Sequence, residues 1–295
     1  MKKILIVVLA LILALAMFAA CQKEEAPQAT DKVDATDAPK DEVTAEPAEA
    51  PLSGEVTVSG STSVEKIGLA LGDEFMAMYP DVKYTYQGIG SSAGVKNANE
   101  GVSMLGTASR NIKDSEKEWG MTEEVLAYDG IAVIVNPANS VTSLTMEQIQ
   151  KIYLGEITNW ADLGGEDQEI VVVSREDGSG TRGAFEEIVE FENMLVTSAL
   201  IQEGNGAVHA AVKENAAAIG YISFTYIDDQ IKTVTVDGAE PTVEEVLAGS
   251  YPVSRPFMIV YHDENLSDAA KAFLEFTKTD LAKEIIEEKG GIAVD

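Results

Sequence analysis

The sequence is poor in the side chains that most often build metal and redox sites. It has one cysteine and two histidines in 295 residues. Aromatic residues are also few, at 6% of the sequence. A lone cysteine cannot form a disulfide within the chain, so the fold has to rest on a hydrophobic core. The two histidines, His209 and His262, are far apart and have no ligand spacing around them. We therefore expect no metal site and no cofactor.

Basic residues are also scarce. Lysine and arginine number 21 against 50 acidic residues, which gives a net charge of −29. Nucleic acid is excluded as an expected partner, because phosphate contacts along a duplex require a basic surface. The phosphate-loop pattern Gly-x-x-x-x-Gly-Lys-Ser/Thr is absent, so nucleotide hydrolysis has no support. A small anion is not excluded, since surface charges beyond about 8–10 Å are largely screened.

The N-terminus has the pattern of a secretory leader. Two lysines are followed by an apolar run from Ile4 to Ala20 and then by Cys21. Residues 1–20 are predicted to be a signal peptide, and Phe18-Ala19-Ala20-Cys21 resembles a bacterial lipobox, although Phe18 stands where an aliphatic residue is usual. The alternative is a permanent membrane helix, for which about 17 residues is near the lower limit. We expect an extracytoplasmic protein anchored to the cell membrane through a lipid on Cys21.

Residues 21–51 differ in composition from the rest of the chain. Alanine, proline, threonine, lysine and acidic residues dominate there, and aromatic residues are absent. Such a segment buries too little apolar surface to offset the entropy of ordering, which predicts a disordered tether. About 240 residues remain, enough for one large or two smaller lobes.

Strand-like and helix-like segments alternate after the tether. This order predicts an α/β fold with mostly parallel sheets. Two similar apolar strands, Ile131–Val135 and Phe257–Tyr261, are candidates for paired crossovers between two lobes. The expected strands are 56–59, 82–87, 103–108, 129–136, 170–174, 219–223 and 257–261, and the expected helices are 64–79, 93–100, 145–153, 181–191 and 267–289.

Three short loops rich in glycine and hydroxyl side chains follow predicted strands and precede helix-compatible segments. They are 59–63 (SGSTS), 88–92 (GIGSS) and 175–181 (REDGSGT). The first turn of a helix has backbone N–H groups without intrahelical partners, and together with hydroxyls these form a site for an anion. Three such loops, one with an arginine, predict a pocket for a small oxyanion.

The third loop has the strongest anion-binding chemistry. The Arg175 guanidinium can present a two-pronged fork to two oxygens, and we expect Asp177 to hold that fork in place. Ser179 and Thr181 supply hydroxyls, while Gly180 permits close approach of the backbone. On this loop alone, a surface turn that caps a helix explains the residues equally well.

Two enzyme motifs also match by spacing. Gly90-Ser91-Ser92-Ala93-Gly94 fits the nucleophile elbow G-x-S-x-G, but Ser92 would need a histidine, and only His262 is a candidate. Ser63-Val64-Glu65-Lys66 fits S-x-x-K without the motifs that accompany it in penicillin-recognising enzymes. A secreted serine hydrolase using Ser92 is therefore a minor alternative, and we expect no enzyme.

Several longer segments together resemble one family, the PstS-type phosphate-binding proteins, which are the solute receptors of ABC phosphate importers. The resemblance covers most of the chain after the tether. The segments that carry it are 86–96 (YQGIGSSAGVK), 152–157 (IYLGEI) with Asn159-Trp160, 175–181 and 218–221 (AIGY).

The resemblance implies a two-lobed periplasmic-binding-protein fold with an interlobe cleft that closes on inorganic phosphate. One lobe would comprise 52–128 and 262–295, and the other 129–261. It also implies a membrane permease as partner, and we expect a monomer. The implied phosphate-binding residues are Thr62, Ser63, Ser91, Ser109, Arg175, Ser179, Gly180 and Thr181.

Ser109 is a departure from the family pattern. Family members often have an aspartate at this position, and that carboxylate accepts the proton of phosphate and repels sulfate. Ser109 carries no charge, so we expect selectivity against sulfate, or between mono- and dibasic phosphate, to differ here. Receptors for sulfate, molybdate or tungstate are the nearest alternatives. The neighbouring Arg110 either adds charge to the site or forms a salt bridge on the lobe, and we favour the salt bridge.

Overall fold

The fold alternates strands and helices along nearly its whole length. It is given by a computed structural model, in which residues 51–294 are described. The predicted signal peptide, Cys21 and the predicted tether up to residue 50 lie outside the described residues. The strands are β1 (Gly54–Gly60), β2 (Val82–Gly88), β3 (Leu105–Ala108), β4 (Thr122–Val135), β5 (Ser143–Leu144), β6 (Val171–Arg175), β7 (Leu200–Gln202), β8 (Ala218–Ser223), β9 (Lys232–Thr233), β10 (Thr235–Val236), β11 (Ser254–Tyr261) and β12 (Ile292–Ala293). The helices are α1 (Glu65–Met78), α2 (Ser91–Asn99), α3 (Asp114–Lys117), α4 (Met146–Leu154), α5 (Gly180–Ile188), α6 (Gly204–Glu214), α7 (Val243–Leu247), α8 (Asp268–Phe276) and α9 (Asp280–Glu288), with 3₁₀ turns η1 (Trp160–Leu163), η2 (Phe224–Tyr226) and η3 (Asp263–Asn265).

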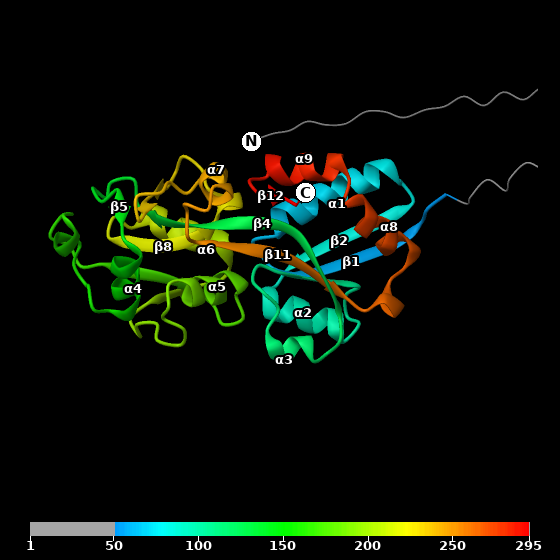
Figure 1. The fold of residues 1–295 in the computed structure, drawn as a ribbon, viewed down its shortest axis with the longest axis horizontal. Helices are drawn as coiled ribbons and strands as arrows, with labels where there is room; N and C mark the ends of the chain where they lie inside the picture. Colours follow the sequence, from blue (N-terminus) through cyan, green and yellow to red (C-terminus); the bar gives the residue numbers. More distant parts are fainter. Residues whose placement is uncertain (1–50, 295) are drawn as a thin grey trace, which may run out of the picture. The chain divides into compact units, whose positions relative to one another are not determined.

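One mixed sheet runs through the described residues in the order β2-β1-β3-β11-β4-β8-β6-β7 (Figure 1). We call β1–β3 with their helices the β1 half, and β6–β8 with theirs the β6 half. Pairing is parallel within each half, but β11 is antiparallel to β3 and β4, and β4 is antiparallel to β8. The prediction of a mostly parallel sheet is therefore wrong at the centre of the sheet. There β4 runs out of the β1 half and β11 runs back into it, so the two strands are antiparallel.

The two long central strands connect the halves, as Figure 1 shows for β4 and β11. β11 pairs with the first part of β4, where Arg255 lies opposite Asp129, and Ile131–Val135 pairs instead with β8. β4 begins at Thr122, seven residues before the predicted start. Its first residues include Glu123 and Glu124 and alternate in exposure, so they lack the continuous apolar character of the buried part.

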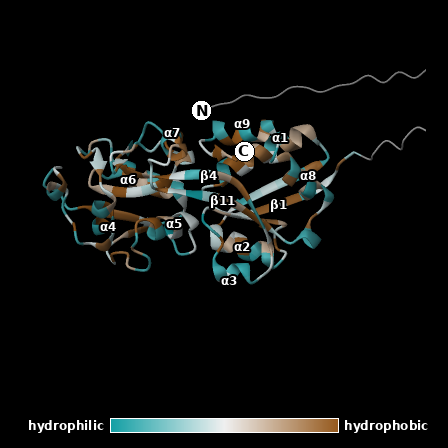
Figure 2. Cartoon of the chain, viewed as in Figure 1, coloured by the Kyte–Doolittle hydropathy of each residue, from teal (hydrophilic) through white to brown (hydrophobic). Residues whose placement is uncertain are grey.

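Each half has its own hydrophobic cluster, and apolar residues concentrate on the inner strands in Figure 2. In the β6 half, Phe185 stacks on Tyr221 with ring centroids 4.1 Å apart, and in the β1 half Phe75 packs edge-on against Phe273. The predicted lobe limits at 128/129 and 261/262 stay a prediction. Phe257 packs in the cluster of the β1 half, which favours a second limit near the start of β11.

The predicted helix 267–289 is two helices, α8 and α9. The hydroxyl of Thr277 donates to the carbonyl of Leu274, and the side chain of Thr279 accepts from the N–H of Ala282 and so caps α9. Threonine hydroxyls compete for backbone groups in this way and favour helix ends over helix interiors. The single-helix prediction was wrong because apolar periodicity continues across the break.

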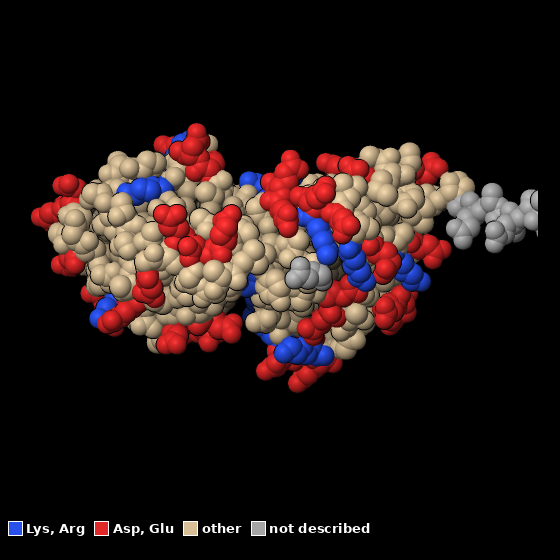
Figure 3. Space-filling view, turned by 45° about the horizontal axis from the view of Figure 1, so that its top comes forward, with Lys and Arg blue, Asp and Glu red and all other residues tan. Residues whose placement is uncertain are grey.

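Acidic side chains cover much of the face seen in Figure 3, on both halves, and lysine and arginine form only small groups among them. Among residues 51–294, no helix combines the length and apolar character needed to cross a bilayer. Because the exposed charge on this face is mainly negative, burial of an anion in this protein depends on local hydrogen-bond donors and not on the general surface charge.

Candidate functional site

The three predicted anion-binding loops lie at the carboxyl ends of β1, β2 and β6. The first loop continues β1 into Ser61–Ser63, and the second leads into α2 at Ser91. The third follows β6, and the hydroxyl of Ser179 caps α5 by accepting from the N–H of Arg182 at 3.2 Å. Strands that run parallel within a half bring their following loops to the same edge of the sheet.

Contacts between the halves bring these loops together. The hydroxyls of Ser63 and Thr181 are 2.8 Å apart, and the N–H of Ser92 donates to the carbonyl of Gly178 at 3.1 Å. Gly180 lies so close to the β1 half that a Cβ there would overlap the Ser91 hydroxyl. Glycine at this position is required by close approach.

The Arg175 guanidinium is almost fully buried, with 1% of its side chain exposed. Its Nε and Nη2 donate to the two carboxylate oxygens of Glu176 at 2.8 and 2.7 Å, and Nη2 also donates to the Thr62 hydroxyl at 3.2 Å. Nη1 is buried and has no hydrogen-bond partner among residues 51–294. A buried guanidinium N–H is costly to leave unpaired, so this edge of Arg175 is suited to an anion.

Glu176, and not Asp177, holds the Arg175 fork. Asp177 is 98% exposed and pairs with Arg182 at 2.8 Å, so the sequence-based role for Asp177 is wrong. Burial acts to raise the pKa of Glu176, but hydrogen bonds from Arg175 outweigh it and leave the pKa below its ordinary value. The carboxylate thus stays ionised at neutral pH and fixes the orientation of the guanidinium through two hydrogen bonds.

The hydroxyls of Ser63, Ser91 and Thr181 form a buried cluster, and Ser109 is fully buried beside Ser91. Its N–H donates to the Ser91 hydroxyl at 3.1 Å, and the two hydroxyl oxygens are 3.4 Å apart. Arg110 forms a two-pronged pair with Glu116, both distances being 2.8 Å, and also donates to Ser92 at 3.1 Å. The salt bridge favoured for Arg110 is confirmed.

Sequence reasoning missed a buried ion pair behind the loops, Arg255 with Asp129. Arg255 Nη2 donates to Asp129 at 2.9 Å and to the Ser63 hydroxyl at 3.0 Å, while Nη1 donates to the carbonyl of Ser109 at 3.0 Å. Both side chains are at most 1% exposed. In the sequence, each apolar crossover strand has one of these charged residues at its edge, which could have marked them as a pair. Only the strand register shows that the two side chains meet.

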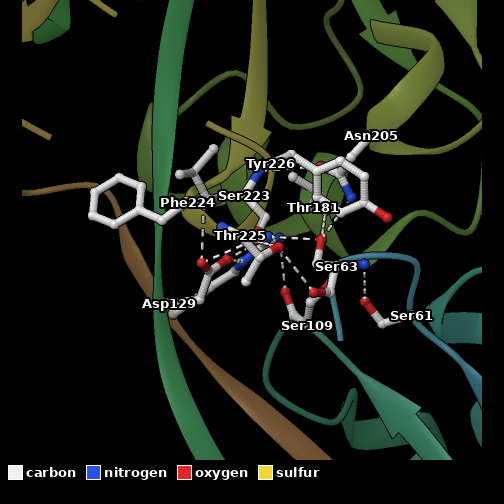
Figure 4. Close-up of polar contacts among 12 residues, drawn as sticks. Ser61, Ser63, Ser109, Asp129, Thr181, Asn205, Ser223, Phe224, Thr225 and Tyr226 are labelled. Carbon is white, nitrogen blue, oxygen red and sulfur yellow. Dashed lines mark hydrogen bonds and ion pairs between the residues drawn. The ribbon is translucent and has the colours of Figure 1, made fainter. Parts of the chain in front are cut away.

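Asn205, at the start of α6, was missed as well. It is fully buried, its amide oxygen accepts from the N–H of Ser223, and its amide nitrogen donates to Thr62 and Ser63. Figure 4 shows Asn205 above Ser63, with Ser223 and Asp129 farther to the left in the same view. Nothing local in the sequence around Gly204-Asn205 marks this role.

A hollow of about 460 Å³ opens beside these residues and reaches solvent. Its lining residues are Thr62, Gly88, Ile89, Glu176, Glu203 and Gly204. Thr62 and Glu176 both contact Arg175, so the wall of this hollow lies directly beside the buried guanidinium.

The geometry gives no support to a hydrolase built on Ser92. The Ser92 hydroxyl accepts from Arg110, while His262 contacts Asn99 at 3.1 Å and His209 contacts Asp228 at 2.8 Å. A serine nucleophile needs a general base within hydrogen-bond reach. Within residues 51–294, no group of three or more histidine, cysteine or acidic side chains is arranged to hold a metal ion.

Comparison with known proteins identifies the family of this chain. A family model described as a PBP superfamily domain matches residues 45–280. The phosphate-binding protein PstS of Bacillus subtilis strain 168 is 31% identical over 248 residues, which cover 82% of this chain and 81% of that protein. This chain belongs to the PstS family.

Two solved structures resemble the chain over about four fifths of its length. One is a Clostridium perfringens protein described as a phosphate ABC transporter substrate-binding protein with bound phosphate; it is 49% identical, with a TM-score of 0.81, and the match covers 82% of this chain and all of that one. The other is an ABC-type phosphate transport receptor from Vibrio cholerae, 37% identical with a TM-score of 0.70, and the match covers 81% of this chain and all of that one. Both support the α/β periplasmic-binding-protein fold described above.

Proposed function

We propose that this PstS-family protein binds inorganic phosphate between its two halves and delivers it to the membrane permease of an ABC importer. The observation that carries the proposal is the buried Arg175 Nη1, which has no hydrogen-bond partner among residues 51–294. The same guanidinium contacts the hydroxyl of Thr62 from the other half through Nη2. The names of the relatives, which describe phosphate-binding receptors and not enzymes, support it.

The proposed phosphate ligands are those expected from the sequence. Arg175 supplies charge, and Thr62, Ser63, Ser91, Ser109, Ser179 and Thr181 supply hydroxyl or backbone donors, with Gly180 allowing the halves to approach. Because the donors come from both halves, the ligand stabilises the closed arrangement.

Isothermal titration calorimetry on the full chain in mild detergent tests this function. We expect saturable phosphate binding with one site per chain. Absence of binding at millimolar phosphate would overturn the proposal. Molybdate and tungstate, titrated in parallel, test the neighbouring oxyanion alternatives.

Sulfate is a second candidate ligand, favoured by one observation. Ser109 is buried beside Ser91, and it is uncharged where a carboxylate would repel an anion that has no proton to share. We expect sulfate to compete with phosphate more effectively here than in a Ser109→Asp variant. Equal sulfate competition in both proteins would show that this position does not control selectivity.

We also propose that the protein acts outside the cytoplasm as a monomer, held to the membrane by a lipid on Cys21. The leader pattern at residues 1–20 supports this placement. Metabolic labelling with a palmitate analogue tests it, with Cys21→Ser as the variant that should lose both the label and the membrane association. Light scattering of the purified protein tests the monomeric state.

A further inference from the structure

The hydrogen bonds around Thr62 and Ser63 determine which way their hydroxyl protons point. A hydroxyl has one proton to donate and two lone pairs to accept with, so two fixed N–H donors use up its accepting capacity. The orientation of every donor near these two residues can be assigned from the contacts, starting from Asn205.

The Asn205 amide has only one possible orientation. One end of it lies 3.1 Å from the N–H of Ser223, a backbone group that can only donate, so this end is the oxygen. The other end is therefore the NH₂ group. Its two protons go to the hydroxyl oxygens of Thr62 at 3.2 Å and of Ser63 at 3.0 Å.

Each hydroxyl also accepts from an arginine. Thr62 accepts from Nη2 of Arg175, whose other proton goes to Glu176, and Ser63 accepts from Nη2 of Arg255, whose other proton goes to Asp129. Both lone pairs on each oxygen are thus occupied. The Ser63 proton points to Thr181, which leaves the Thr181 proton available for the ligand, and the Thr62 proton is available directly.

We propose that Asn205 and Arg255 are positioning residues that turn the Thr62 and Ser63 hydroxyls into obligatory proton donors, so that the cleft prefers the form of its anion that carries fewer protons. The inference rests on the proposed function, phosphate binding. Monobasic phosphate brings two protons that need acceptors and dibasic phosphate brings one, and these two hydroxyls cannot accept any of them. Sulfate brings no proton, so its oxygens only accept, and dibasic phosphate is closer to it than monobasic phosphate is.

The elements around Thr62 and Ser63 carry several charged and titratable groups. They are Arg175 and Glu176 after β6, Glu203 before α6, Arg255 on β11, Asp129 on β4, Tyr226 in η2, Tyr86 on β2, and Glu65 and Lys66 on α1. Burial raises the pKa of Tyr226 to about 12 and that of Tyr86 still further. Burial also raises the pKa of Asp129, to about 6. The test therefore runs from pH 6.5 to 8.5, and sulfate, which keeps its charge there, serves as the reference for any titration of the protein.

The first experiment is calorimetry of the full-length wild-type protein with phosphate and with sulfate across this pH range. We expect apparent phosphate affinity to weaken by about fivefold from pH 8.5 to 6.5, following the dibasic fraction, while sulfate affinity stays constant. Phosphate binding that is equally tight at both pH values would overturn the inference while leaving the proposed function intact, and so would failure of sulfate to bind. Absence of phosphate binding at every pH would overturn the proposed function itself.

The second experiment uses Asn205→Ala, which removes both amide donors and frees the hydroxyls to accept. We expect the fivefold pH effect on phosphate binding to shrink toward none, in addition to any loss of affinity. The matched control is Asn97→Ala, because Asn97 also donates an amide proton to a serine hydroxyl, that of Ser59 at 3.2 Å. The control should keep the wild-type pH effect. If Asn205→Ala loses affinity but keeps the full pH effect, its role is structural and the inference is wrong.

Discussion

Arg175 and Arg255 are both buried at this site, and they differ in how completely their donors are used. Arg175 has Glu176 on one edge and an unpaired Nη1 on the other, as far as residues 51–294 go. On Arg255, by contrast, Nε, Nη1 and Nη2 all donate within the protein, to Asp129, Ser63 and Ser109. A guanidinium with a free edge is fit to bind a ligand, whereas one that is fully paired is fit to hold the binding loops in place. The difference predicts that substituting each arginine damages a different property.

The largest expected effect is on stability, from Arg255→Met. This change leaves the carboxylate of Asp129 buried with only Ser223 and Phe224 as donors. Breaking one side of a buried ion pair costs about 3–5 kcal/mol of unfolding free energy. Urea denaturation at pH 8 measures it, and a loss below about 1 kcal/mol would show that the two arginines do not differ in this way.

The loss should depend on pH in a defined direction. Burial already raises the pKa of Asp129 to about 6 with Arg255 present, and removing Arg255 raises it further. A carboxyl whose pKa is higher in the folded state favours folding when protonated. The deficit of Arg255→Met relative to wild type should therefore be greatest at pH 8 and shrink toward pH 5; a deficit independent of pH would argue against a buried, unpaired carboxylate.

Arg175→Ala should mainly affect binding. Charged hydrogen bonds contribute about 1.5–3 kcal/mol, so we expect phosphate affinity to fall by about 10- to 150-fold. Calorimetry measures the affinity, and urea denaturation of the same sample provides the contrast with Arg255→Met. If Arg175→Ala lowered stability more than Arg255→Met did, the assignment of the two roles would have to be exchanged.

Ser91→Ala should have a smaller effect on phosphate affinity. The hydroxyl accepts from the N–H of Ser109, and a neutral hydrogen bond contributes about 0.5–1.5 kcal/mol. We expect a loss of about 2- to 12-fold by calorimetry. Equal small losses for Ser91→Ala and Arg175→Ala would count against the proposed pocket.

Asp177→Asn should have the smallest effect, within about 0.5 kcal/mol for both stability and binding. Its carboxylate is almost fully exposed and its pair with Arg182 lies on the surface, where ion pairs contribute little. Glu176→Gln is the matched comparison one residue away, and it should weaken phosphate binding because it loosens the Arg175 fork. A larger effect from Asp177→Asn than from Glu176→Gln would contradict the geometry.

The features that sequence reasoning predicted well are local ones. Loops of glycine and hydroxyl residues between a strand and a helix were recognisable because neighbouring residues create their chemistry, as with Ser179 capping α5. The order of strands and helices followed from apolar patterning for the same reason. Resemblance to a family then supplied the two-lobed fold, which periodicity alone left open.

The features that were missed depend on the fold as a whole. Arg255 and Asp129 are 126 residues apart, and only the register of β4 against β11 places them opposite each other. Asn205 likewise meets Ser63 across 142 residues. Glu176 and Asp177 are both carboxylates beside Arg175, and side-chain direction, which composition does not encode, decided between them.

The hydrogen bond from the N–H of Ser92 to the carbonyl of Gly178 is a backbone contact between the two halves, which continuous strands and side-chain contacts also link. An amide proton in the β4–β11 ladder stays paired however far the cleft opens, whereas the Ser92 amide is paired only when the cleft is shut. Ser92 therefore provides a natural reporter of closing. Its rate of exchange with deuterated water should slow when ligand is added, and the rate in the free protein divided by that of an unprotected amide gives the fraction of time that the cleft is open.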